Sequence, residues 1–327
     1  MKHSNISIFI PHTGCPHMCS FCNQHTISGA QHAPSGDEVR KTCSDAYSYI
    51  KNRGNCEIAF FGGSFTAVPE KYRTELLESV QEFIGNDGFR GIRISTRPDC
   101  IDESILESLK KYHVTAIELG CQSMDDEVLR LNDRGHTAEH VVKASELIKA
   151  YSFELGHQMM TGLYGSTPEK DSLTADAIIS LKPDTVRIYP VVILEGTRLA
   201  ELYKSGEYLT YSLEEMAGYC SSFMQRFEEN GIRVIKCGLH ASDNVEGEMI
   251  GGYYHPAFRE LCESRIYRDK LEKILRKGSY RIQVRNDLVS KVIGQKRSNI
   301  NYFSLKGINI KVVPSEQKEE LNVFKIT

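Results

Sequence analysis

The sequence lacks several features that would assign it to a specialised class of protein. No apolar run reaches the about 18 residues that a membrane-spanning helix requires, and Met1–Pro11 has the pattern of a β-strand rather than of a secretory signal. It contains no internal repeat and no low-complexity segment. The net charge is only −3, so no overall basic field indicates a nucleic-acid partner, although a local patch could still bind one. We therefore expect a cytoplasmic globular protein without a membrane partner.

Clustered cysteines are also few, although the chain contains ten cysteines. In a reducing cytosol such residues do not build a disulfide framework, and clustered thiols bind metal instead. Only Cys15, Cys19 and Cys22 are close in sequence. The others are expected to be small buried apolar residues: Cys43, Cys56, Cys100, Cys121, Cys220, Cys237 and Cys262. A second metal centre built from them is the less favoured interpretation.

The three clustered cysteines have the spacing C-x3-C-x2-C and follow a predicted strand at Ile6–Ile10. Thiolates that converge from one short loop are soft ligands, which suit an iron–sulfur cluster or zinc. A cluster of four irons held by three thiolates keeps one iron open to a small molecule. A structural zinc site is closed by four ligands, and His12, His17 or His25 could supply the fourth. The chemistry favours a cluster, with zinc and buried structural thiols as the alternatives.

Strands and helices alternate along most of the chain. Six short apolar or β-branched runs, each followed by turn residues, predict strands: Ile6–Ile10, Glu57–Phe61, Ile92–Ser95, Ala116–Leu119, Phe153–Met159 and Thr185–Tyr189. Helical patterns separate them, and a capping box at Ser35–Glu38 opens the first. Six β–α units in series predict an α/β protein whose parallel sheet is open or curled into part of a barrel. Ligands bind at the carboxyl ends of such strands, which is where the cysteine loop is expected.

A different pattern follows Ile232–His240, where the alternation ends. Pro256–Lys277 predicts one charged helix that stops at Gly278. Strands are predicted at Tyr280–Arg285 and Ile308–Pro314, with two short helices between them. We therefore expect a core over residues 1–245, a helical connector over 246–278 and a small α+β unit over 279–327.

Polar motifs follow several of the predicted strands. Gly62 and Gly63 end the second strand, where paired glycines let the backbone approach a ligand and offer free N–H groups to it. Ser95 and Arg97 end the third strand and offer a hydroxyl and a guanidinium, which suit ribose hydroxyls or a carboxylate. Taken singly, each motif is better explained by an ordinary turn, a helix cap or a salt bridge.

The cysteine loop, with Phe21 between its second and third cysteines, resembles that of the radical S-adenosylmethionine (radical SAM) superfamily. The resemblance implies a partial (β/α)6 radical SAM barrel, and it implies that Cys15, Cys19 and Cys22 hold a [4Fe–4S] cluster. The open iron would then bind the amino and carboxylate groups of SAM. Gly62, Gly63 and Ser64 match the motif that contacts the methionine amino group, although many members have glutamate where Ser64 stands.

Further strings between Gly14 and Tyr208 resemble the catalytic-subunit family of the Elongator complex, within the same superfamily. The shared strings are "FFGGSFTA", "STRPD", "IELGCQS", "RGHT" and "RIYPVVILEGTRLAELYKSGEY". By that resemblance Ser95 and Gln122 contact SAM, and Phe21 supports its adenine. Tyr189 and His157 would lie near the substrate as catalytic candidates.

The chain also departs from relatives within that superfamily. Elongator-like enzymes that modify wobble uridine carry a long acetyltransferase domain, which the residues after His240 do not resemble. Methylthiotransferases carry three more cysteines before the first strand, and coproporphyrinogen oxidases have a cysteine where Gln24 stands. These departures count against acetyl-CoA-dependent carboxymethylation by this chain alone, against methylthiolation and against porphyrin chemistry.

The predicted C-terminal unit resembles the minimal core of the KH family, in which a G-x-x-G loop clamps single-stranded RNA. The corresponding loop is Gly294–Arg297, where Arg297 replaces the second glycine. Lys296 and Arg297 provide positive charge that could meet phosphate. The alternative is a solvated edge that packs on the barrel and binds no RNA.

The leading hypothesis is a radical SAM enzyme that acts on RNA, with tRNA as the first substrate to test and an electron donor such as ferredoxin or flavodoxin. The second is an RNA-binding protein with a structural or redox-sensing cluster, and the third is a zinc-stabilised interaction module. Cleavage of SAM separates the first from the others, and the iron-to-zinc ratio separates the second from the third.

Overall fold

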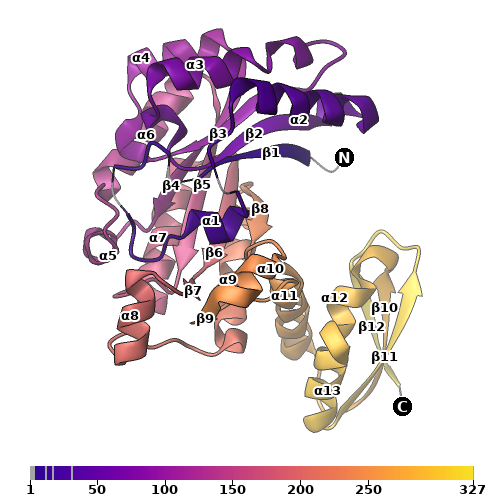
Figure 1. Ribbon diagram of the computed structural model, residues 1–327. Helices are drawn as coiled ribbons and strands as arrows, with labels where there is room; N and C mark the ends of the chain where they lie inside the picture. The colour runs from indigo at the N-terminus through magenta and orange to yellow at the C-terminus, as the bar shows by residue number, and fades with distance from the viewer. Residues whose placement is uncertain (1–3, 12, 17, 31, 327) are drawn as a thin grey trace.

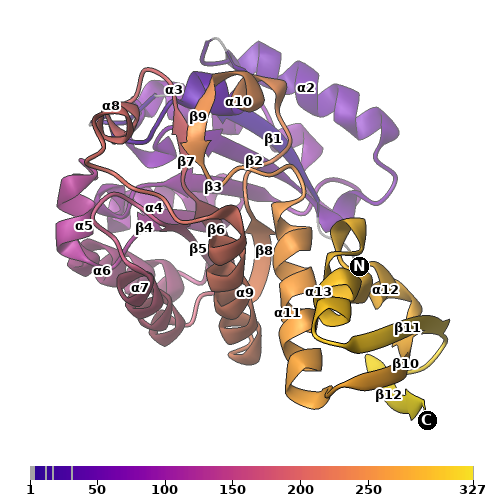
Figure 2. The same cartoon turned by 90° about the horizontal axis from the view of Figure 1, so that it is seen from below.

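A wholly parallel sheet of seven strands forms the main body of the protein, whose computed structural model describes residues 4–11, 13–16, 18–30 and 32–326. The strands are β1 (Ser4–Ile10), β2 (Cys56–Gly62), β3 (Ile92–Thr96), β4 (Val114–Gln122), β5 (Glu154–Thr161), β6 (Thr185–Pro190) and β8 (Arg233–Cys237). Their order across the sheet is the order of the chain, so β1 and β8 are its two edges. The sheet curls into part of a barrel (Figures 1 and 2). The predicted fold class is therefore confirmed.

The seventh strand corrects the prediction that the alternation ends near Ile232–His240. β8 pairs with β6 in the same parallel sheet, from Thr185↔Arg233 to Ile188↔Cys237. The strand was missed because Arg233 and Lys236 interrupt its apolar pattern, whereas the six predicted strands are mostly apolar.

Helices cover the outer face of this sheet. The longer ones are α2 (Gly36–Tyr49), α3 (Glu70–Glu78), α4 (Glu103–Lys111), α6 (Ala138–Ala150), α7 (Pro168–Leu181) and α9 (Leu213–Glu229). The capping box at Ser35 is formed as predicted, with its side chain and that of Glu38 each accepting a backbone N–H. Shorter helices lie in the connections: α1 (Gln24–Ser28), α5 (Asp126–Leu131), α8 (Arg198–Ser205) and α10 (Asp243–Glu248). Short 3-10 turns occupy Arg53–Asn55, Phe65–Ala67, Gln81–Phe83, Pro98–Cys100, Asn286–Leu288 and Gln295–Arg297.

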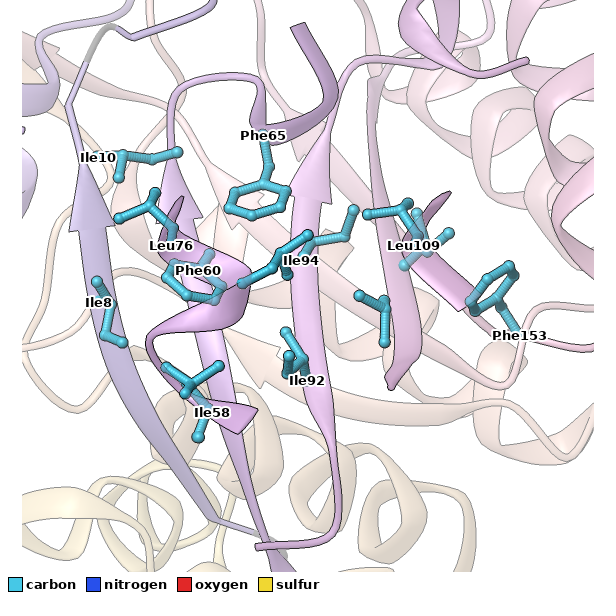
Figure 3. Packing of buried hydrophobic residues seen from close by; sticks show 14 of the residues in the cluster. Ile8, Ile10, Ile58, Phe60, Phe65, Leu76, Ile92, Ile94, Leu109 and Phe153 are labelled. Carbon is cyan, nitrogen blue, oxygen red and sulfur yellow. The ribbon is translucent and has the colours of Figure 1, made fainter. Parts of the chain in front are cut away.

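The two faces of the sheet differ in polarity because side chains alternate along each strand. On the outer face, apolar residues such as Ile58, Phe60 and Ile94 are fully buried against Leu76 and Leu109 of the helices (Figure 3). Each such side chain stabilises the fold by about 1.5–3 kcal/mol. The inner face carries polar and charged residues instead, and it is this face that forms the site described below.

The C-terminal unit has a three-stranded sheet and a hydrophobic core of its own. Its elements are β10 (Gly278–Arg285), α12 (Val289–Ile293), α13 (Ser298–Leu305), β11 (Ile308–Ser315) and β12 (Leu321–Ile326). β10 is central, parallel to β11 and antiparallel to β12. The strand, two helices and strand lie in the predicted order. The resemblance to KH domains stays a prediction.

The helix α11 (Phe258–Ile274) joins this unit to the barrel. Its first half packs Phe258 and Cys262 into the barrel's second apolar cluster, and its second half packs Tyr267 and Leu271 into the core of the C-terminal unit. Upstream, β9 (Met249–Gly252) pairs with β7 (Val192–Leu194) beside the barrel. The boundaries at 245 and 278 stay predictions.

Within the described part of the chain, every helix is too short or too polar to cross a lipid bilayer.

Candidate radical SAM site

A cavity of about 470 Å³ opens at the carboxyl edge of the parallel sheet. It is lined by Ser7, Phe9, Phe21, Cys22, Gln24, Ile27, Ser28, Phe61, Gly62, Ser95, Gln122, Gln158, Met160, Arg187, Tyr189, Pro190, Val192, Leu194, Lys236, Leu239 and His240. Among the described residues, neither an aspartate nor a glutamate lines this cavity. Its walls are therefore neutral or positively charged, which suits a ligand that carries negative groups.

The three predicted cluster cysteines lie together beside this cavity. Cys22 lines it, and burial together with the charges of Cys19 and Cys15 raises the pKa of Cys22 to about 12. Arg134 donates a hydrogen bond from Nη1 to the Sγ of Cys19 at 3.0 Å. The Sγ of Cys15 lies 3.7 Å from the Oγ of Ser64. The loop therefore presents three neighbouring thiols, one of which accepts a hydrogen bond from a buried guanidinium.

The paired glycines hold the cysteine loop against β2. Gly63 donates its N–H to Ile10 at 3.0 Å, and Ser64 donates to Thr13 at 3.0 Å. A Cβ atom on Gly63 would lie 1.9 Å from the carbonyl oxygen of Thr13, so only glycine fits. The prediction that the glycine motif offers free N–H groups to a ligand is thus wrong at Gly63, because the loop itself uses that group.

The middle of the loop is fixed from a second direction by Ser20. Its N–H donates to the carbonyl of Asn132 at 3.1 Å, and its hydroxyl donates to Oδ1 of the same residue at 2.8 Å. The carbonyl of Ser20 accepts the N–H of Leu199 at 2.8 Å. Elements more than a hundred residues apart in sequence therefore hold the thiols in place.

The chemistry of the donor set, three thiols from one short loop, fits an iron–sulfur cluster, and zinc is the alternative. Tetrahedral zinc with Zn–S bonds of about 2.3 Å brings its sulfur ligands to within about 3.8 Å of one another. In the described ranges, no group of three His, Cys, Asp or Glu side chains is arranged to hold one metal ion. His25 contacts the carbonyl of Ala30 through Nδ1 at 2.9 Å, and the two other candidate zinc ligands, His12 and His17, lie outside the described residues.

Four of the predicted SAM-contacting residues line the cavity, namely Phe21, Gly62, Ser95 and Gln122. The Oε1 atom of Gln122 is buried and has no hydrogen-bond partner, and its backbone is left-handed with φ of 64°. Burying an unpaired amide oxygen costs about 1–3 kcal/mol, so this atom is available to a ligand donor. Gly63 and Ser64 lie behind the wall, against the cysteine loop.

Arg97 is paired with a neighbouring acidic residue. Its guanidinium donates two hydrogen bonds to Asp99, at 2.9 and 2.8 Å, and it does not line the cavity. The guanidinium is therefore held by an acidic residue two positions along the chain, and contact of Arg97 with a ribose or a carboxylate of the ligand stays a prediction.

The two catalytic candidates lie on opposite faces of the sheet. Tyr189 lines the cavity, and burial raises the pKa of its phenol, which therefore stays protonated. His157 lies on the outer face, fully buried, with Nε2 2.9 Å from the Oγ of Ser145 in α6. The placement of His157 near the substrate is thus wrong, because its position in β5 directs it toward the helices. Gln158, the next residue, faces the cavity.

The buried His157 is expected to make the protein less stable in mild acid. Burial lowers its pKa from 6.5 to about 3, so between these values the unfolded chain binds a proton that the folded protein does not. Its contribution is greatest above pH 6.5 and falls as the pH drops, by about 1.4 kcal/mol between pH 7.5 and 5.5. Urea denaturation of wild type and His157→Gln at both pH values measures this. His157→Gln should lose less unfolding free energy than wild type between pH 7.5 and 5.5. An equal loss in the two proteins would contradict the assignment of this pH dependence to His157.

A buried ionic network lies on the inner face of the sheet. Arg93 contacts Glu57 at 2.7 Å, Glu118 at 3.4 Å and Glu154 at 2.7 Å. Arg187 donates two hydrogen bonds to Glu118, at 2.6 and 2.9 Å. Burial alone would raise the pKa of Glu118, but the two arginines hold it below its usual value. The network therefore stays charged. It also holds neighbouring polar residues of the inner face in place, such as Gln158.

Several residues of the site had no assigned role in the sequence analysis. Arg134 was visible only as part of the "RGHT" string, and its contact with Cys19 requires the fold. Gln158 donates to Ser95 and to Glu118, each at 3.0 Å, linking the network to the cavity wall. Lys236 comes from the strand that was missed. The C-terminal residues Gly294, Lys296 and Arg297 do not line this cavity.

Comparison with known proteins agrees with the resemblance seen in the sequence. Residues 9–177 match the radical SAM superfamily, and residues 183–268 match the radical SAM C-terminal domain. The chain is 37% identical over 140 residues to the tRNA uridine(34) acetyltransferase of Methanocaldococcus jannaschii, which covers 41% of this chain and 26% of that protein. It is 26% identical over 238 residues to the protein of the same name from Dehalococcoides mccartyi, covering 62% and 52%. The chain thus spans between about a quarter and a half of these relatives.

A solved structure supports the fold. The archaeal Elp3 of Methanocaldococcus infernus superposes with a TM-score of 0.59 at 21% identity, covering 84% of this chain and 64% of that one. The superfamily match covers residues 9–177, which is 169 of 327 residues, and it includes the three-cysteine loop and most of the cavity wall. On this sequence match, with a fold and a thiol site that agree with it, the chain belongs to the radical SAM superfamily.

Proposed function

We propose that the protein is a radical SAM enzyme that modifies RNA, with tRNA as the first substrate to test. The observation that carries the proposal is the placement of Cys15, Cys19 and Cys22 beside a cavity at the carboxyl edge of the sheet, which no carboxylate of the described residues lines. When bound by these thiols, a [4Fe–4S] cluster supplies the electron that cleaves SAM to methionine and a 5′-deoxyadenosyl radical. An external donor, such as a ferredoxin or flavodoxin, would provide that electron.

The protein's own residues would bind SAM and keep its products apart from water. Phe21 offers an apolar surface to the adenine, and Gln122 offers its unpaired oxygen to a donor group of SAM. Ser95 is held in place by Gln158. Tyr189 presents a protonated phenol to a ligand in the cavity. These roles orient the cofactor and position a substrate, which is what the protein must add to the cofactor's chemistry.

The decisive test is anaerobic. The protein is reconstituted with iron and sulfide, reduced with dithionite, and incubated with SAM in the presence and absence of tRNA. We expect 5′-deoxyadenosine to form. If the full cluster assembles but no cleavage occurs under either condition, the enzymatic proposal fails.

A second candidate function is favoured by one feature of the C-terminal unit. Lys296 and Arg297 are consecutive left-handed residues, with φ of 50° and 62°, on an exposed loop. Such conformations cost energy for residues other than glycine, and they persist where the surrounding structure enforces them. Here the side-chain amide of Asn299 holds the loop in place, because it donates hydrogen bonds to the carbonyls of Ser264, Lys291 and Val292. The alternative is therefore an RNA-binding protein whose cluster is structural or redox-sensing.

The loop is expected to contribute to RNA binding in either case. Within the described residues, neither Lys296 nor Arg297 has an ion-pair partner, whereas the nearby Lys291 is paired with Glu263 at 3.1 Å. The double variant Lys296→Ala/Arg297→Ala should weaken tRNA binding about tenfold and reduce the slope of log affinity against log salt by about 1–2. Filter binding at several salt concentrations measures both, with Lys291→Ala as the matched control. If the slope of log affinity against log salt is unchanged in the double variant, the loop does not bind RNA phosphates and its role is structural.

A further inference from the structure

The cavity has one cation whose charge is not balanced. Lys236 lies on β8 directly beside Arg187 on β6, since the two residues are paired in the sheet register, and both line the cavity. Arg187 is neutralised by Glu118, whereas Lys236 has no hydrogen-bond or ion-pair partner within the described ranges. Like charges on paired strand positions destabilise a sheet. A stabilising role therefore does not explain this lysine.

Other charged groups around Lys236 increase the imbalance. Burial lowers its pKa, and the charges of Arg187 and Arg259 lower it further. Arg259 is itself paired with Glu263, at 3.0 Å. His240 also lines the cavity; burial lowers the pKa of its imidazole, and the charge of Lys236 lowers it further. An anion bound here would relieve the repulsion that the free protein carries.

The position of Lys236 is at the open side of the partial barrel. β1 and β8 are the two edges of the sheet, and the cavity reaches both, because Ser7 and Phe9 of β1 line it together with Lys236 of β8. The C-terminal unit lies on the side of the molecule where β8 and the start of β1 lie (Figures 1 and 2).

Aromatic surface accompanies the cation. The rings of Phe9 and Phe61 line the cavity with their centroids 6.2 Å apart, and the guanidinium of Arg187 lies 5.0 Å from the centre of the Phe61 ring. Aromatic rings beside a cation are a combination that binds single-stranded nucleic acid. The bases stack on the rings, and the phosphates contact the cation.

We propose that Lys236 binds a phosphate of an RNA strand that enters through the side between β1 and β8, with a base of that strand against Phe9 and Phe61. The proposal rests on the proposed function, and it adds a substrate subsite to it. The other anion available to Lys236 is the carboxylate of SAM, and the experiment separates the two.

The test compares reconstituted wild-type protein with Lys236→Met and with Lys143→Met, a control that removes a lysine 70% exposed on α6. The probe is a fluorescein-labelled 17-nucleotide RNA hairpin with a seven-nucleotide loop, titrated by anisotropy at several salt concentrations. Lys236→Met should bind about tenfold more weakly, with a salt slope lower by about 0.7–0.9. Lys143→Met should match wild type, and Lys236→Arg should restore most of the affinity. RNA-independent cleavage of SAM by Lys236→Met is measured in parallel and compared with that of Lys143→Met.

Three results would overturn the proposal. If RNA binding and its salt slope are unchanged in Lys236→Met, or if wild type does not bind the hairpin, the lysine does not hold an RNA phosphate. If Lys236→Met loses RNA-independent cleavage, the lysine serves SAM instead. Absence of cleavage by wild type, in contrast, would refute the proposed function while the titration still tests Lys236. Lys236→Met is expected to fold at least as stably as wild type, because it removes the repulsion with Arg187, and its urea midpoint reports this.

Discussion

Replacing Cys19 by alanine is expected to remove both the visible absorbance of the reconstituted cluster and all formation of 5′-deoxyadenosine. Cys19 is the buried member of the three thiols, and it alone accepts a hydrogen bond from Arg134, at 3.0 Å. Two thiols cannot hold three corners of a cluster, so cluster and activity should be lost together. Anaerobic reconstitution followed by absorbance, iron analysis and the cleavage assay measures the effect.

Cys43→Ala is the matched control for this experiment. Cys43 is a fully buried thiol of α2 that packs in the outer apolar core, on the other side of the sheet from the cavity. The variant should retain iron content and cleavage, with the small loss of stability that removal of one buried sulfur entails. An unchanged spectrum in Cys19→Ala, or an equal loss in both variants, would refute the assignment of the cluster ligands.

Replacing Arg93 by methionine is expected to lower the free energy of unfolding by about 3–5 kcal/mol, because it leaves buried carboxylates without their cation. Glu57 and Glu118 are each about 1% exposed or less, and Arg93 contacts both. Protonation of one carboxyl would relieve part of the cost, so the loss should shrink as the pH falls toward 5. Urea denaturation at two pH values measures both effects.

Arg90→Met provides the comparison for Arg93→Met. Arg90 contacts Glu154 at 3.4 Å, but its side chain is 47% exposed, so its removal should cost about 0–1 kcal/mol. Should Arg93→Met not fold, Arg93→Lys keeps the charge while losing the three-way contact and should be intermediate in stability. A loss in Arg93→Met no larger than that in Arg90→Met would show that the network does not hold the sheet together.

Much of this architecture could be predicted because the strands are apolar and the motifs fall at their ends. The six predicted strands and the C-terminal strand–helix–helix–strand order need only local patterns. β8 was missed because two cations interrupt its apolar pattern. Lys236 lines the cavity, whereas Arg233 pairs with Glu154 at 3.3 Å.

The faces of the strands could have been assigned more sharply. In β5 the alternation places Leu155, His157 and Met159 on one side and Gln158 on the other. Two buried apolar neighbours therefore indicate that His157 faces the core, and a strict period of two would have chosen Gln158 for the cavity. In contrast, the contact of Arg134 with Cys19 joins residues 115 positions apart, and no local pattern predicts it.

The order of the sheet has a consequence for synthesis. Because the strands are added across the sheet in the order of the chain, each one leaving the ribosome can join an edge that already exists. The cysteine loop, however, receives its last anchors only when Asn132 and Leu199 have been made. A nascent chain therefore exposes its three thiols long before it can enclose them. During that interval the thiols lack the contacts that hold them in place in the finished protein.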